Sequence, residues 1–441
     1  MASEDQSQRK QRPLRRPRNE RGPRAARTLL PAVLLLANLL ASCAYWQGRG
    51  EADPYASRVQ SIVAGSRFDV ARWEVHAAEG ALADRLRFGQ PNPLADDTSQ
   101  RVLDYLNRAQ RIGEIERQIE GAAAGAPLQA DRDPPLPDSE AELAALRDLQ
   151  EEERPYVERA LEAQVSLLIG EEGLGWLGGP LPPPTFRFTE PPNYLVISPR
   201  DHIDLRLGLS LVPRLALEQR ERLEQRLEAE LPNTSAMVTS TGGFPSWPTM
   251  IADQAGVDWI LATIAHEWTH LYLVAFPLGM HYYDDQDVTA MNETLAQIVG
   301  DELGARALHR FYPQRAAGGL STEAQSRRLA QQSSFDFNEE MRLTRERVDS
   351  LLAEGKVEEA EAYMEQRRQE FVAGGYYIRR LNQAYFAFHG SYRTGPAAPS
   401  EDPVAPRLQR LRRESANLAA FLVAARRLRR LEDLVALVPM P

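Results

Sequence analysis

Cysteine is nearly absent from this chain of 441 residues, in which Cys43 is the only one. A disulfide framework is thereby excluded, so any domain outside the cytoplasm must be stabilised by its own apolar core. A sole cysteine fits a role decided by its chemistry better than one decided by packing. Histidine is scarce as well, with 7 residues in the whole chain, so two histidines at ligand spacing are a specific signal.

Apolar residues near the N-terminus do not form a long enough run for a typical membrane-spanning helix. The run from Leu29 to Ala44 is shorter than the roughly 20 residues that such a helix prefers, and it follows a basic arm at residues 1–27. This layout is typical of a secretory signal or a short membrane anchor. The end of the run, Leu40–Cys43, resembles the bacterial lipobox, in which the cysteine becomes the lipidated N-terminus. A lipoprotein and an uncleaved transmembrane anchor both stay open, and either would hold the rest of the chain outside the cytoplasm at the cell membrane.

Positive charge is concentrated in that basic arm. It holds nine Arg or Lys residues against three acidic ones, a net charge of +6, whereas the whole chain carries −10. The remainder therefore carries about −16. Such an acidic domain is expected to be soluble and not to bind nucleic acid.

The stretch Val257–Phe276 is apolar on nearly every side, which predicts a helix buried in the middle of a domain. His266, Glu267 and His270 are the exceptions. The two histidines are four residues apart, so both imidazoles leave the same face of the helix, one turn apart. Burying these groups among apolar side chains costs several kcal/mol unless something binds them.

These three residues form the H-E-x-x-H pattern of zinc metallopeptidases. Neutral imidazole nitrogens are zinc ligands, and a glutamate beside the metal can accept a proton from the water that zinc activates. By chance, the pattern is expected in roughly one such chain in a hundred. The alternative is a core helix whose histidines satisfy backbone carbonyls.

A third ligand candidate lies in Met291–Gly304, which predicts a second helix with one apolar stripe. A separate face of that helix is formed by Glu293, Gln297, Gly300 and Gly304. A carboxylate followed by two glycines on one face indicates the close approach of another helix. The 22 residues between His270 and Glu293 leave room for a turn and a loop. An ordinary solvated glutamate is the alternative.

The sequence resembles the gluzincin clan of zinc peptidases, which includes thermolysin and the alanyl aminopeptidases, at His266–His270 and Asn292–Ala296. The resemblance implies a zinc cofactor held by His266, His270 and Glu293, with Glu267 as the general base. It also implies that Asn292 supports the ligands from behind. One position departs from the clan: an acidic residue that commonly supports a histidine is replaced by Gln297, which predicts a somewhat weaker metal site.

Two further catalytic candidates follow from the same resemblance. Tyr283 lies in the loop between the two zinc helices and is expected, by analogy with a gluzincin tyrosine, to stabilise the oxyanion. His389 is the second donor candidate, because gluzincins often use a histidine or tyrosine from the region after those helices. The alternatives are a surface loop for Tyr283 and an aromatic core helix for His389.

The predicted fold class is α+β, mainly α-helical, with a small mixed sheet beside the H-E-x-x-H helix and long helical segments elsewhere. The resemblance implies that the catalytic part is zincin-like. Strands are expected at Tyr194–Ser198, Ile203–Leu211 and Ala236–Thr241. Met237–Thr241 is hypothesised to be an edge strand that binds an extended peptide, with an ordinary buried strand as the alternative. Helices are expected over Tyr55–Leu86, Ser99–Gly121, Ser139–Gly170, Arg214–Leu231, Asn338–Leu352, Val357–Phe371 and Arg407–Val438.

The predicted boundaries follow these patterns. They are a basic cytoplasmic arm at 1–27, a signal, lipobox or anchor segment at 28–46, a helical N-terminal region at 47–172, a zincin-like catalytic core at 173–334, and a helical hairpin with C-terminal helices that completes the site at 335–441.

The sequence as a whole predicts a membrane-anchored, extracytoplasmic zinc metallopeptidase that hydrolyses peptide bonds. Its expected partners are a peptide or protein substrate and the membrane. The alternative is a non-catalytic envelope protein that keeps a zinc-peptidase fold for binding or structural use. That alternative predicts either no metal or a site closed by a fourth protein ligand, for which His281 is the candidate.

Overall fold

The structure is a computed structural model in which the described residues are 53–123, 136–176, 179–244, 246–282, 284–317, 336–374, 376, 378–391, 396–399 and 402–439. The basic arm at 1–27 and the predicted signal or anchor segment at 28–46, with Cys43, lie outside the described residues. Tyr283 lies outside them too.

The predicted transmembrane anchor has no counterpart among the described helices. None of these helices is both long and apolar enough to cross a bilayer, so that expectation is wrong for this part of the chain. The buried helix α7 (Val257–Leu273) illustrates the reason. It has 17 residues, fewer than the roughly 20 that span a membrane, and it carries two histidines and two acidic residues.

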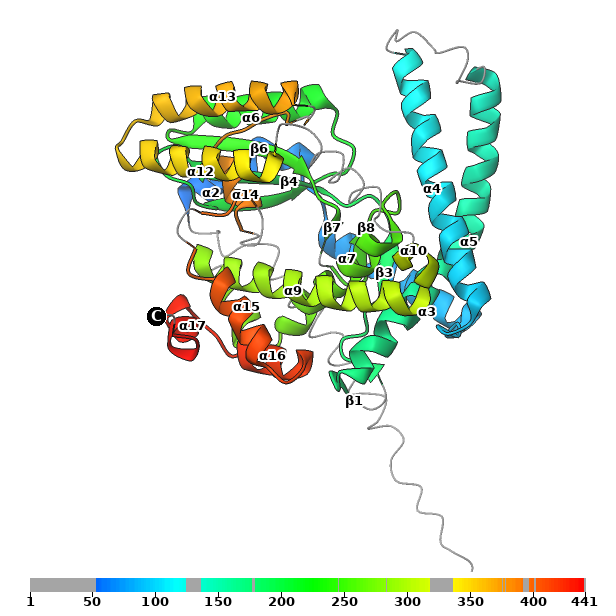
Figure 1. Ribbon diagram of the computed structural model, residues 1–441. Coiled ribbons are helices and arrows are strands. Elements are labelled where there is room, and N and C mark those ends of the chain that lie inside the picture. The colour runs from blue at the N-terminus through cyan, green and yellow to red at the C-terminus, as the bar shows by residue number, and fades with distance from the viewer. Residues whose placement is uncertain are drawn as a thin grey trace, which may run out of the picture.

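The N-terminal region is helical, as predicted, and consists in chain order of α2 (Pro54–Val63), α3 (Val70–Phe88), α4 (Asp96–Ala123) and α5 (Leu136–Glu171). α4 and α5 pack along each other (Figure 1), and the C-terminal half of α5, with Leu161 and Leu168, belongs to the main buried core. The single helix predicted over Tyr55–Leu86 is wrong, because the chain breaks between α2 and α3. Asp69 caps the new start by accepting a hydrogen bond from the N–H of Arg72.

An antiparallel sheet follows, with strand order β5–β4–β6. Its strands are β4 (Asn193–Pro199), β5 (Leu207–Leu211) and β6 (Thr234–Ser240), and α6 (Leu217–Glu230) connects β5 to β6. Side chains alternate between the two faces of a strand. Leu195 and Ile197 therefore pack with residues of α2 and α6, while Val196 between them packs with residues of α14.

A second sheet has the order β3–β8–β7 and is mixed. β3 (Phe186–Phe188) runs parallel to β8 (Thr249–Ile251), which pairs antiparallel with β7 (Gly243–Phe244). Both β7 and β8 contact α7, so a small mixed sheet lies beside the H-E-x-x-H helix, as predicted, but the strands that were predicted form the antiparallel sheet instead. A short hairpin of β1 (Gly175–Trp176) and β2 (Gly179–Pro180) precedes it.

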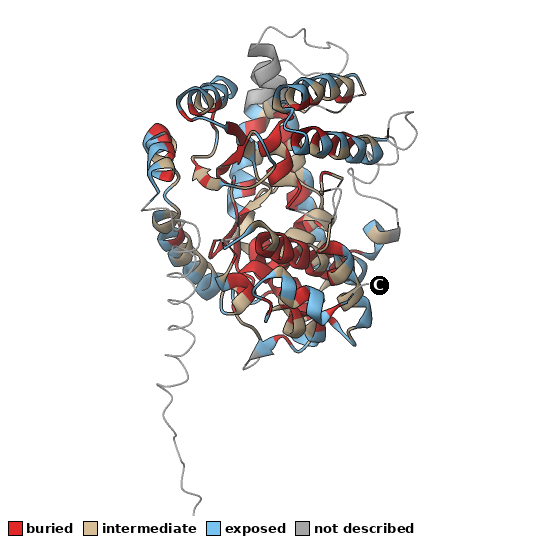
Figure 2. Cartoon of the chain, turned by 90° about the vertical axis from the view of Figure 1, so that its left-hand side faces the viewer, coloured by how far each residue is buried: buried red, intermediate tan, exposed pale blue. Residues whose placement is uncertain are grey.

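α7 and α9 (Gln286–Phe311) form the most closely packed pair of helices that the structure describes, with the short α8 (Pro277–Met280) between them and α10 (Pro313–Ala317) after them. The two glycines of α9 permit this approach, as predicted. A Cβ at Gly300 would lie 2.8 Å from the carbonyl oxygen of Ala262, and one at Gly304 would lie 2.7 Å from its Cα. Buried residues gather in the middle of the molecule, whereas the outer helices turn exposed residues to the solvent (Figure 2).

The C-terminal part begins with the predicted helical hairpin, α12 (Phe337–Ala353) and α13 (Val357–Ala373). α14 (Gln383–His389) then packs on β4 and β6. The single helix predicted over Arg407–Val438 is wrong, because the chain forms α15 (Ala405–Glu414), α16 (Leu418–Ala425) and α17 (Leu431–Leu437) against α9. Asn417 starts α16 by accepting a hydrogen bond from the N–H of Ala420.

Candidate metal centre

The face of α7 that carries both histidines is turned toward α9. Gly300 of α9 lies against His266, where an added Cβ would be 3.0 Å from the Cβ of the histidine. The side chain of His270 is only 4% exposed and that of His266 12% exposed. The spacing that predicted two imidazoles on one helix face is therefore realised in a buried setting.

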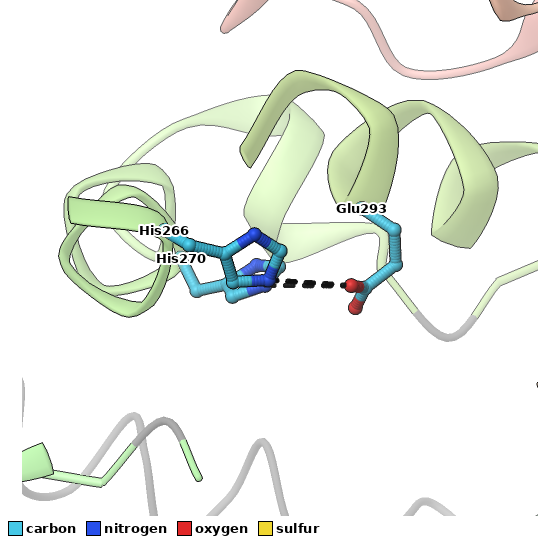
Figure 3. A group of neighbouring side chains, drawn as sticks. All are labelled: His266, His270 and Glu293. Atoms are coloured by element: carbon cyan, nitrogen blue, oxygen red, sulfur yellow. Dashed lines mark hydrogen bonds and ion pairs between the residues drawn. The ribbon is translucent and has the colours of Figure 1, made fainter. Parts of the chain in front are cut away.

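Glu293 of α9 faces the two imidazoles (Figure 3). Its Oε2 lies 3.7 Å from Nε2 of His266 and 3.6 Å from Nε2 of His270, and the two Nε2 atoms are 3.0 Å apart. A tetrahedral zinc ion with bonds of about 2.0–2.1 Å holds its ligand atoms roughly 3.3 Å apart. The three atoms already stand at about the separations that a single zinc ion requires.

The hydrogen bonds of His270 and Glu293 use Nδ1 and Oε1, so Nε2 and Oε2 remain available for a metal ion. Nδ1 of His270 lies 2.7 Å from Oδ1 of Asn292, whose amide nitrogen donates to the carbonyl oxygen of Leu278. Oδ1 therefore accepts from Nδ1–H, and in the neutral ring that binds a metal the lone pair of Nε2 points into the site. Tyr282 donates its hydroxyl to Oε1 of Glu293, whereas Oε2 is buried without a hydrogen-bond partner among the described residues. A buried, unpaired carboxylate oxygen beside two imidazole nitrogens fits a cation.

Burial and charge act against each other on these groups. Burial lowers the pKa of His270, but the Glu293 and Glu267 carboxylates outweigh it and raise that pKa to about 9. Burial raises the pKa of Glu293, yet the two imidazoles outweigh it and hold that pKa well below its usual range. Glu293 is therefore ionised at neutral pH and is an anionic ligand.

Glu267 projects beside the ligand group. It is 6% exposed, and its Oε2 has no hydrogen-bond partner among the residues that the structure describes. Burial raises its pKa, although the two imidazoles oppose that shift. The carboxylate lies against Gly243 of β7, where an added Cβ would be 2.5 Å from Oε1. Glycine at this position leaves space for the carboxylate, which is a candidate general base.

A cleft of about 730 Å³ lies over these residues, and both ligand helices line it. On the opposite wall are Tyr194, Leu205, Phe388 and His389. The predicted donor His389 thus shares the cleft with the metal-ligand candidates. Burial lowers its pKa to about 4, so at neutral pH the ring is uncharged and can donate one N–H.

Two tyrosines of the site were not singled out from the sequence. Tyr282 holds Glu293, and the signal that could have found it was its place in the loop between the two ligand helices. The predicted oxyanion donor Tyr283 lies outside the described residues and stays a prediction. Tyr194 of β4 lines the cleft, and burial together with the Glu293 charge raises its pKa, so its hydroxyl keeps its proton. No pattern in the sequence around Tyr194 connects this residue to the H-E-x-x-H motif.

Two other expectations differ from the structure. Gln297 lines the cleft but donates to Asp301, not to an imidazole, so the supporting contact comes from Asn292 instead. His281, the candidate fourth ligand, pairs with Asp284 through Nδ1 and lies outside the group of three close ligand candidates that the described residues form.

β6 lies at an edge of its sheet, as hypothesised for a peptide-binding strand, but much of that edge is occupied. The N–H groups of Ala236 and Val238 donate to the carboxylates of Glu228 and Glu224. Their carbonyl oxygens accept from Asn382 and Arg379. The segment that borders the metal centre is Ser240–Phe244 instead, which lines the cleft and includes β7.

No protein-family model matches this sequence, and comparison with curated proteins and with solved structures gave no match either. The gluzincin resemblance therefore stays a prediction, supported by the motif residues of α7 and α9 and by the geometry around them.

Tyr282→Phe is expected to weaken zinc binding about tenfold, because groups that orient a ligand from behind typically contribute ten- to a hundredfold. Without the hydroxyl, Oε1 of Glu293 loses its donor and the carboxylate is free to turn. Competition with a fluorescent chelator measures the affinity. Tyr363→Phe on α13 is the matched control, and an affinity equal to that of the wild-type protein in both variants would contradict this role for Tyr282.

Proposed function

We propose that this protein is a zinc-dependent hydrolase of peptide bonds, of the gluzincin type. The observation that carries the proposal is the unpaired, buried Oε2 of Glu293, which faces Nε2 of both His266 and His270 at zinc-ligand spacing. We also infer that α7, α9 and the mixed sheet beside them correspond to a zincin-like catalytic domain. The H-E-x-x-H motif, the second-helix glutamate and the sheet position support that inference.

The donor set suits a catalytic zinc site. Two imidazoles and one carboxylate are the protein ligands of such sites, which keep one position for water or substrate. Among the described residues, only these three side chains form the ligand group, and the cleft gives access to it. A non-catalytic site closed by a fourth protein ligand has no support in this arrangement.

The chain's own residues have separate tasks in the proposed reaction. Zinc, when bound, would lower the pKa of a water molecule and polarise the scissile carbonyl. Glu267 takes the proton of the attacking water and passes it to the leaving amine. His389 and Tyr194, on the opposite wall, are the candidates for donating a hydrogen bond to the oxyanion.

The wall beside Glu267 suits an extended substrate. β7 is the last strand of the order β3–β8–β7, and its Gly243 places backbone directly against the general base. An extended peptide that pairs with Ser240–Phe244 would present its scissile carbonyl to Glu267.

The test is metal content combined with hydrolysis. Purified full-length protein is expected to contain about one zinc per chain by elemental mass spectrometry. It is expected to cleave an unstructured protein such as casein, to lose that activity with a chelator and to regain it with added zinc. Zinc without any hydrolysis would favour the non-catalytic alternative, and no zinc even after reconstitution would overturn the proposal.

A further inference from the structure

The elements around the cleft fall into two lobes. The sheet lobe contains β4–β6 with α2, α6 and α12–α14, and the helical lobe contains α3–α5, α7–α10 and α15–α17 with the mixed sheet. Each apolar cluster of the described residues lies within one lobe. The largest joins α5, α7, α9 and α15–α17, while others join the antiparallel sheet to α2, α6 and α14, and α14 to α12 and α13. Among the described residues, no shared apolar core therefore fixes one lobe on the other.

The proposed catalytic groups are divided between the lobes. The three metal-ligand candidates and Glu267 belong to the helical lobe, whereas Tyr194 and His389 belong to the sheet lobe, across the cleft of about 730 Å³. Neither Tyr194 nor His389 makes a side-chain hydrogen bond with a described residue, so both donors remain available to a ligand. A donor of one lobe can serve an oxyanion at the metal centre of the other only when the lobes stand close enough.

Two short connections cross between the lobes side by side. The residue pairs that mark the facing ends of the two sheets are Asn193 with Ser240 in one, and Phe188 and Gly243 with Ile251 in the other. Only residues 189–192 and 241–242 lie between these ends. The hydroxyl of Thr241 donates to the carbonyl oxygen of Pro192 at 3.2 Å, which holds the two connections together. We call them the hinge.

A third connection, at residues 64–69, follows the sheet lobe for most of its length. The carbonyl oxygen of Ser66 accepts from the N–H of Val212, and the N–H of Phe68 donates to Ser210. Asp69 then caps α3, which belongs to the helical lobe. The passage between the lobes is therefore confined to the junction of Phe68 and Asp69.

A second hollow, of about 1190 Å³, lies on the other side of the hinge. It is lined by Gly113 and Glu116 of the helical lobe, by Arg214–Ala216 of the sheet lobe, and by Thr189 and Glu190 of the connection. We call it the back crevice. In Figure 1, α9 crosses below the sheet lobe and the pair α4–α5 stands to its right, with β3, β7 and β8 between them. The cleft and the back crevice therefore flank the hinge on opposite sides.

Only weak attraction acts across the back crevice at Arg214. Its Nε donates to Glu190, which raises the pKa of Arg214, and the Glu116 carboxylate of α4 adds to that shift. The Arg214 side chain is 85% exposed, so solvent screens these charges. Widening the crevice here therefore costs little free energy.

We propose that the sheet lobe rotates about the hinge, so that the cleft closes while the back crevice widens, and that holding the back crevice at its present width keeps the metal centre inactive. Lobes without a large apolar interface move relative to one another. A substrate that contacts both walls of the cleft binds the closed form better and so shifts the lobes toward it. Closure brings Tyr194 and His389 toward the scissile carbonyl and excludes water. This regulation rests on the proposed function of the metal centre.

The experiment holds the back crevice at fixed width in the zinc-loaded full chain. Cys43→Ser removes the native thiol, and Glu116→Cys with Arg214→Cys places one thiol on each side of the crevice. Before cross-linking, this variant should hydrolyse casein. The shortest bismaleimide that bridges the two thiols is expected to lower kcat about a hundredfold, because losing an oxyanion donor typically costs that much or more. The zinc content should not change.

Two controls separate a fixed crevice from chemical modification. A long, flexible bismaleimide on the same two thiols should keep the rate, because it lets the crevice widen. Glu116→Cys with Arg147→Cys joins α4 to α5 within the helical lobe, where the native side chains form an ion pair, and its short cross-link should also keep the rate. An undiminished kcat with the short linker across the crevice, confirmed by mass spectrometry, would overturn the proposal.

A distance measurement separates closure from hydrolysis. Spin labels at Arg347→Cys on α12 and Glu432→Cys on α17, both exposed, report on the two lobes by double electron–electron resonance. The distance is expected to shorten when zinc and a peptide hydroxamate, which ligates zinc, are added. The pair Arg347→Cys and Glu218→Cys lies within the sheet lobe and should not change.

The outcomes distinguish the two proposals. A shorter distance between the lobes with no peptide cleaved in any assay would support closure and count against the hydrolase. An unchanged distance would overturn closure, and hydrolysis of casein by the same preparation would then leave the proposed function standing.

Discussion

Glu267→Gln is expected to lower kcat for peptide hydrolysis about a thousandfold or more while the zinc content stays near one per chain. General-base catalysis typically contributes 10²–10⁴-fold, and an amide of the same shape cannot accept the proton of the attacking water. The ligand group His266, His270 and Glu293 does not include Glu267, so metal binding should survive. Initial rates and elemental mass spectrometry on the same preparation measure both quantities.

The same variant should not unfold the protein. Glu267 is a buried carboxylate with an unpaired oxygen, and burial raises its pKa, so its charge is unfavourable to the folded state. A neutral amide at this position is expected to leave the melting temperature unchanged or to raise it slightly, because catalytic groups are often kept at a cost to stability. Glu218→Gln, an exposed position on α6, is the matched control. Chelator-sensitive hydrolysis at a substantial fraction of the wild-type rate would refute the assignment of Glu267.

The ligand group could be predicted because its information is local. Histidines four residues apart must lie on one face of a helix, and Glu293, Gly300 and Gly304 must lie on one face of the next helix. The close approach of these two faces was therefore sufficient to predict the ligand group. In the structure, Gly304 of α9 packs directly against Ala262 of α7, as the position of the glycines predicted. The strands of the antiparallel sheet could be predicted from their apolar patterns. The strands of the mixed sheet beside α7 have only two or three residues each, too few to carry such a pattern.

The rest of the site depends on tertiary contacts and on irregular backbone. Tyr282 lies in the short segment between α8 and α9, where no periodicity says which side chain points inward. Tyr194 lines the cleft from β4, far away in the sequence from the motif, because the fold brings the antiparallel sheet to the same cleft as α7 and α9. The breaks at Asp69 and Asn417 are caps inside segments whose apolar spacing continued, so periodicity alone merged separate helices.

His270→Ala and Glu293→Ala are each expected to lower zinc affinity about a thousandfold. Structural zinc sites are worth roughly 10–16 kcal/mol, so one of three protein ligands accounts for several kcal/mol. The loss should exceed the ten- to hundredfold expected for Asn292→Ala, which removes only the acceptor that orients His270. Chelator competition ranks the three variants, and elemental mass spectrometry after dialysis shows which of them still carry metal.

The two ligand variants should differ in stability when zinc is removed with a chelator. His270→Ala leaves the Glu293 carboxylate buried without its main imidazole neighbour, and an unpaired buried charge is destabilising by about 3–5 kcal/mol. Glu293→Ala removes the buried charge itself and should destabilise less. His202→Ala, an exposed histidine beside Asp201, is the matched control for metal binding and stability. Full zinc retention in both ligand variants would mean that the metal binds elsewhere, and equal stability of the two would mean that Glu293 is not held as a buried anion by His270.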